Sequence, residues 1–109
     1  MPTTYKVLGQ SNPSATTATT LYTVPASTST IISTITVCNQ ASSAATYRIA
    51  VRPAGATLAA QHYIVYGATV AASDTTTLTL GLTLATTDVV TVYASSANLS
   101  FNAFGSEIA

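Results

Sequence analysis

The sequence predicts an all-β protein, a single antiparallel β-sandwich of seven to eight strands that is either immunoglobulin-like or jelly-roll-like. Apolar and polar residues alternate with a period of two along most of the 109 residues, as they do in half-buried strands. Clusters of Pro, Asn, Asp and Ser interrupt these runs at the short intervals typical of sandwiches. The only stretch that favours a helix, Ala56–Gln61, has room for a single turn.

The clearest strand is Thr77–Leu84, in which leucines at 78, 80, 82 and 84 alternate with threonine or glycine. Alternate side chains of a strand point to the same face, so all four leucines are expected in the core. Burial of each leucine contributes roughly 1.5–3 kcal/mol. The other expected strands are Tyr5–Leu8, Leu21–Val24, Ile31–Cys38, Tyr47–Arg52, His62–Tyr66, Val90–Ser95 and Leu99–Ala103.

Turn residues separate these strands, because Asn, Asp and Ser bend the backbone through local hydrogen bonds and Pro fixes φ. The expected turns are Asn12–Ser14, Pro25–Ser27, Asn39–Ala44, Pro53–Gly55, Ser73–Asp74, Thr87–Asp88 and Ser95–Asn98. The length allows one domain, residues 1–109. Within it, residues 1–18 are a candidate N-terminal strand and arm.

The chain is almost without charge. Only 6% of its residues are charged, against about 25% in an average domain. Three basic residues balance three acidic ones, and Thr, Ser and Ala fill nearly half of the sequence. Three cations cannot form the basic stripe of a nucleic-acid-binding protein, and they offer little to an anionic membrane. No segment approaches the ~18 consecutive apolar residues of a membrane span. We therefore expect neither nucleic acid nor membrane as a partner.

The residues that could carry chemistry do not form a recognisable constellation. His62 is the only histidine, and no nucleophile elbow accompanies it. Asp88 is expected to accept hydrogen bonds from backbone N–H groups in a turn. Cys38 is the only cysteine, so it can form neither an intramolecular disulfide nor a cysteine zinc site, and we expect it to be buried and inert. The sequence thus predicts no enzyme, no cofactor and no metal site.

A contact surface is the more promising functional feature. Two of the three cations lie on one face of the expected strand Tyr47–Arg52, where they are either solvated or in contact with a partner. Several tyrosines fall in expected strands, and some of them are expected in the core with the hydroxyl at the rim. Tyrosine is also frequent in protein interfaces and on sugar-binding faces. The candidate interface residues are Arg48, Arg52, Tyr22, Tyr63, Tyr66 and Tyr93.

The scarcity of charge also predicts an assembly. Exposed strand edges recruit other strands unless charge, proline or a covering segment prevents it. A free monomer with so few charges is expected to associate. We therefore expect the chain to form homo-oligomers or to dock on other subunits.

Several segments carry a resemblance to a known group of proteins. They are LYTVPA (Leu21–Ala26), IISTITVCN (Ile31–Asn39), YRIAVR (Tyr47–Arg52), LTL (Leu82–Leu84), DVVTVYAS (Asp88–Ser95), LSF (Leu99–Phe101) and FGSE (Phe104–Glu107). Over residues 19–108 the chain resembles small β-sandwich structural proteins of tailed bacteriophages, including phages of cyanobacteria and other aquatic hosts.

The resemblance implies a non-enzymatic component of the virion, assembled in the host cytoplasm. The expected role is a capsid decoration or cement protein that binds the major capsid protein and copies of itself. One alternative is a tail, neck, collar or baseplate subunit that docks fibres. Independently of the resemblance, the tyrosines leave open a glycan-binding module for host adhesion.

Overall fold

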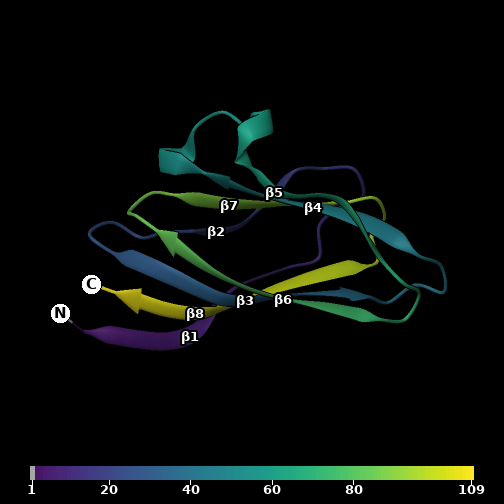
Figure 1. Ribbon diagram of the computed structural model, residues 1–109, viewed down its shortest axis with the longest axis horizontal. Helices are drawn as coiled ribbons and strands as arrows, with labels where there is room; N and C mark the ends of the chain where they lie inside the picture. The colour runs from purple at the N-terminus through teal and green to yellow at the C-terminus, as the bar shows by residue number, and fades with distance from the viewer. Residues whose placement is uncertain (1) are drawn as a thin grey trace.

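The computed structural model describes residues 2–109, which form two four-stranded antiparallel sheets packed face to face (Figure 1). Each of the eight expected strands is present, and the expected turns lie in the connections between them, although the first turn falls at residues 15–16 and not at Asn12–Ser14. The strands are β1 (Thr3–Ser11), β2 (Thr19–Thr23), β3 (Ser29–Asn39), β4 (Ala45–Arg52), β5 (Tyr63–Val70), β6 (Thr75–Leu84), β7 (Val89–Ala94) and β8 (Leu99–Ile108). The predicted antiparallel β-sandwich is confirmed.

The strand order selects one of the two predicted architectures. The first sheet has the order β1-β8-β3-β6 and the second has the order β2-β7-β4-β5. The antiparallel pairs β1–β8, β2–β7, β3–β6 and β4–β5 are nested, as in one long hairpin rolled over on itself. This is the eight-stranded jelly-roll arrangement, whereas an immunoglobulin domain divides its strands differently between the sheets.

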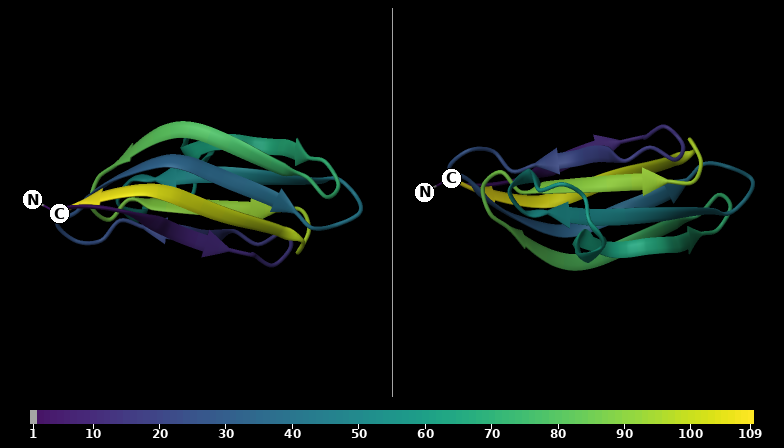
Figure 2. Two further views of the ribbon diagram at one scale, coloured as in Figure 1. Left: turned by 90° about the horizontal axis from the view of Figure 1, so that it is seen from below. Right: turned by 90° about the horizontal axis from the view of Figure 1, so that it is seen from above.

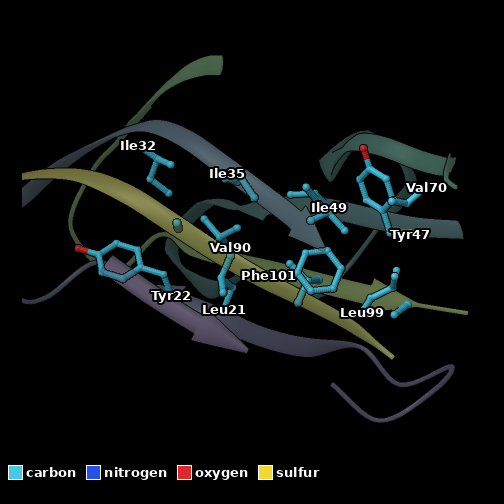
Figure 3. Close-up of a cluster of buried hydrophobic side chains, with 14 of the residues drawn as sticks. Leu21, Tyr22, Ile32, Ile35, Tyr47, Ile49, Val70, Val90, Leu99 and Phe101 are labelled. Atoms are coloured by element: carbon cyan, nitrogen blue, oxygen red, sulfur yellow. The ribbon is translucent and has the colours of Figure 1, made fainter. Parts of the chain in front are cut away.

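The core lies between the two sheets and is filled by the alternate residues of each strand (Figure 3). Its largest fully buried side chains are Phe101, Ile32, Ile35, Ile49 and Leu99. The rings of Tyr47 and Phe101 meet edge to face across the two sheets, with their centroids 6.2 Å apart. This packing is what the period-two pattern of the sequence predicts.

A row of bulges crosses the first sheet beside Phe104. Relative to β8, both β1 and β3 contain one extra residue at this level. In β1 it lies between Val7 and Gly9, and in β3 it lies between Ile32 and Thr34. The extra residue in β3 is Ser33, whose hydroxyl donates a hydrogen bond to the Phe104 carbonyl at 3.1 Å. The bulge resets the alternation, so that Ile32 and Ile35 both face the core although they are three positions apart.

The same irregularity corrects the prediction that four leucines of β6 are buried. Between its pairs with Thr34 and Ile32, β6 contains one residue more than β3, and Gly81 adopts a φ of +63° there. Leu84 is 4% exposed, whereas Leu80 is 38% exposed beside this bulge. Strict alternation could not predict this, because the bulge exposes Leu80 while Leu78 and Leu82, on either side of it, still pack against the core.

Three smaller expectations also change. The stretch Ala56–Gln61 is mostly irregular, and a short 3₁₀ turn occupies Ala60–His62. Residues 12–18 do not leave the domain as an arm, because Thr16 N–H donates to the Ala94 carbonyl and Asn12 donates to the carbonyls of residues 97 and 99. Cys38 is half-buried on the outer face of β3 and not fully buried.

Truncating two leucines of β6 tests the corrected register. We expect Leu84→Ala to lower the free energy of unfolding by about 2–5 kcal/mol, because it leaves a cavity in the core. Leu80→Ala is the matched control and should cost less than about 1 kcal/mol, since Leu80 lies at the surface. Urea denaturation of both variants measures the difference. Equal losses would contradict the bulge.

Candidate functional site

The outer face of the second sheet gathers four of the six candidate interface residues. Arg48 of β4 pairs with Tyr93 of β7 on one side and with Tyr66 of β5 on the other. Its guanidinium carbon lies 4.2 Å from the ring centroid of Tyr66 and 4.3 Å from that of Tyr93. Tyr63 meets Tyr66 edge to face with the centroids 4.9 Å apart. We call these four residues the Arg48 cluster.

A hollow of about 600 Å³ adjoins the Arg48 cluster. It is lined by Tyr63 and Tyr66 and by the connecting residues Leu58, Ala59 and Ala60. Tyr66 is 65% exposed, so most of its side chain is open to a ligand. His62 helps to shape this connection, because its Nδ1 accepts a hydrogen bond from the Ala59 N–H at 3.1 Å.

Arg52 holds the neighbouring turn. Its guanidinium donates to the carbonyls of Gly55 and Ala56 at 3.0 and 2.6 Å. Asp88 supports the same turn: one carboxylate oxygen accepts the Ala54 N–H and the other accepts the Ala85 N–H, each at 2.9 Å. The turn role expected for Asp88 is confirmed. Arg52 uses its donors within the chain, which leaves it little capacity to bind a partner.

Tyr22 lies in the core and must be removed from the candidate interface, because only 7% of it is exposed. Its hydroxyl lies 2.8 Å from the Thr30 hydroxyl and donates a hydrogen bond to the Glu107 carboxylate. Lys6 of β1 forms an ion pair with the same carboxylate at 2.8 Å. This network ties β2 to the first and last strands. No local pattern in the sequence could predict it, since its members are far apart along the chain.

The network shifts the pKa of two of its groups. Burial raises the pKa of Tyr22 to about 12, and the hydrogen bond to Glu107 adds to this rise. The hydrogen bond from Lys6 lowers the pKa of the Glu107 carboxyl, and the hydrogen bond from Tyr22 lowers it further. The folded chain therefore favours a neutral tyrosine and an ionised glutamate.

The outer face of the first sheet has a different character, which the local sequence patterns did not predict. The register places Tyr5 and Val7 of β1, Ile31 of β3 and Phe104 of β8 next to one another on this face. All four are exposed, and Tyr5 is 83% exposed. We call them the apolar patch. A hollow of about 390 Å³ lies beside Tyr5, Ile31 and Phe104, and it is also lined by Lys6, Ser33, Gly105 and Ser106.

No charged side chain of residues 2–109 is placed by the register on this outer face. Its other positions are taken mainly by threonine, serine and asparagine: Thr34, Thr36, Thr77, Thr79, Thr83, Asn102 and Ser106. The nearest charge is Lys6, which lines the hollow. The register pairs Lys6 with Gly105 on the core side of β1, and its amine forms an ion pair with Glu107. Figure 2 shows this sheet from below, with β6, β3, β8 and β1 side by side.

Other kinds of site are not seen in the described part of the chain. Within residues 2–109 there is no group of three or more His, Cys, Asp or Glu placed to hold a metal ion. No helix among the same residues is long and apolar enough to cross a membrane.

Comparisons with protein-family models, with curated proteins and with solved structures find no match to this chain. The two outer faces and their chemistry are therefore the basis for a functional proposal.

The pKa shifts predict how stability depends on pH. The lowered pKa of Glu107 stabilises the fold above the unfolded-state pKa of 4.5, and this contribution is lost as the pH falls through the folded-state value. The raised pKa of Tyr22 stabilises the fold fully below pH 10, and this contribution is lost between pH 10 and about 12. Urea midpoints measured across both ranges should decline at each end.

Two variants identify the residue responsible for each decline in stability. Glu107→Gln should flatten the acidic decline, and Tyr22→Phe should reduce the alkaline one. Tyr47, whose pKa burial also raises, keeps a part of the alkaline decline in the second variant. An acidic decline that is unchanged in Glu107→Gln would contradict the role given to this network.

Proposed function

We propose that this chain is a non-enzymatic structural protein of a bacteriophage virion, and that it serves as a capsid decoration or cement protein. One observation carries the proposal: the outer face of the first sheet exposes the apolar patch, and the register of the described strands places no charged residue on this face. Exposed apolar groups that lie together mark a surface that binds another protein. The one charged residue beside the patch, Lys6, is already paired with Glu107, so docking there would not bury an unpaired charge.

The proposed partner is the major capsid protein, with neighbouring copies of this chain at the margins. Burial of Tyr5 and Phe104 would supply the aromatic contacts that often dominate binding energy. Surrounding threonine and serine hydroxyls can form hydrogen bonds with a partner without the cost of burying a charge. The jelly roll is also a fold that many viral capsid proteins use, although a fold alone does not determine a function.

Copy number tests the role. Quantitative mass spectrometry of purified virions of the phage that encodes the chain should find hundreds of copies per particle. A multiple of six or twelve would move the chain to the tail, neck or baseplate, where the alternative role is to dock fibres. Absence of the chain from purified particles would overturn the virion proposal altogether.

A charge introduced into the apolar patch tests the docking face. Val7→Glu should lower binding of the purified protein to capsids that lack it by at least tenfold, because docking would bury an unpaired carboxylate. Thr77→Glu is the matched control: it adds the same charge to an exposed position of the same outer face, on β6 and away from the patch. Co-sedimentation with capsids measures binding, and circular dichroism checks that each variant is folded. Wild-type binding by Val7→Glu would contradict this docking face.

A further inference from the structure

We infer that the Arg48 cluster and its adjoining hollow form a binding site for an acidic saccharide, a sugar chain that carries carboxylate groups. The site lies on the outer face of the second sheet, opposite the apolar patch. Its ability to bind sugar does not depend on the proposed function. Only its place on a particle rests on that proposal, because docking through the first sheet would leave the second sheet facing the surroundings.

The two tyrosines give the hollow the character of a sugar platform. Tyr63 and Tyr66 stand almost perpendicular, at 86°, and both line the hollow. A pyranose ring presents an apolar C–H face that stacks on an aromatic ring, while its hydroxyls remain in water. A shallow site with aromatic walls suits such a ligand better than an enclosed apolar cavity would. The volume, about 600 Å³, is within the range of small-molecule sites.

Arg48 supplies the preference for an acidic sugar. Its guanidinium lies between the rings of Tyr66 and Tyr93, which hold it in place at the surface of the sheet. Within residues 2–109, no carboxylate forms an ion pair with it; Glu107 is taken by Lys6, and Asp88 binds backbone N–H groups. A guanidinium that is already oriented can bind a carboxylate through two parallel hydrogen bonds. Such a positive charge beside aromatic walls matches a sugar acid.

The two outer faces differ in chemistry, and the difference favours a protein partner for one face and an acidic saccharide for the other. The apolar patch offers large side chains and no charge, as suits docking on a protein. The Arg48 cluster offers a single cation and tyrosine hydroxyls beside a hollow. A neutral, apolar partner would leave the charge of Arg48 unpaired on burial, which costs free energy. An acidic saccharide pairs with that charge and leaves much of the site in water.

The purified protein can be titrated with an oligogalacturonate and, in parallel, with a neutral galacto-oligosaccharide of equal length. Isothermal calorimetry should detect binding of the oligogalacturonate and at least tenfold weaker binding of the neutral sugar. Added salt should weaken the first interaction, since its ionic part is screened. No binding of the oligogalacturonate at millimolar concentration, or equal affinity for both sugars, would overturn the inference.

Substitutions locate the site. Tyr66→Ala should abolish binding of the oligogalacturonate, and Arg48→Gln should reduce it at least tenfold and remove the preference over the neutral sugar. Tyr5→Ala is the matched control, an exposed tyrosine on the opposite face, and should bind like the wild type. If the control loses binding while Tyr66→Ala retains it, the site lies elsewhere and the inference fails.

This test is separate from the test of the docking face. Tyr66→Ala should still bind to capsids, and Val7→Glu should still bind the oligogalacturonate. Loss of sugar binding alone would leave the docking proposal standing, and loss of capsid binding alone would leave the saccharide site standing. Far-ultraviolet circular dichroism verifies that each variant is folded before either measurement.

Discussion

The antiparallel pairing of β1 with β8 is the constraint on which the rest of the structure depends. It joins the first strand to the last, and the Ala109 N–H donates to the Pro2 carbonyl where the two ends meet (Figures 1 and 2). The pairing sets Val7 beside Phe104, which creates the apolar patch from residues nearly a hundred positions apart. It also brings Lys6 to Glu107, the carboxylate that Tyr22 contacts from the second sheet. The apolar patch and the hydrogen-bond network between the sheets thus both depend on the pairing of β1 with β8.

The two sheets divide the chemistry of the chain between them. The first sheet carries threonine, serine and apolar side chains on its outer face, whereas the second carries the two arginines and a cluster of tyrosines. One arginine, Arg52, is used to hold a turn, and the other, Arg48, is held between aromatic rings. With only three cations in the chain, their placement is the main difference between the faces. Such a division allows a small protein to contact a neighbour with one face while it presents the other.

Local patterns in the sequence were enough to predict the strands and turns, because alternation and turn residues act over a few positions. They did not predict which strands pair, so the choice between jelly roll and immunoglobulin fold stayed open. Leu80 was assigned to the core because a bulge is invisible to strict alternation. Tyr22 was assigned to a surface because its partners, Thr30 and Glu107, become neighbours only through long-range pairing. The four residues of the Arg48 cluster were predicted as interface candidates from their residue types. That they lie together could not be predicted, because it depends on how three strands pair.

The nested pairing of strands also constrains how the chain folds. The β4–β5 pair closes a short connection, while the β1–β8 pair must join segments at opposite ends of the chain. Closing a longer loop costs more entropy, and folds dominated by such distant contacts form slowly. Until β1 arrives, the backbone groups along one side of β8 have no partner. A newly synthesised chain therefore passes through a period in which a strand edge with a single charged residue, Glu107, is open to other molecules, and its yield depends on concentration and temperature during that period.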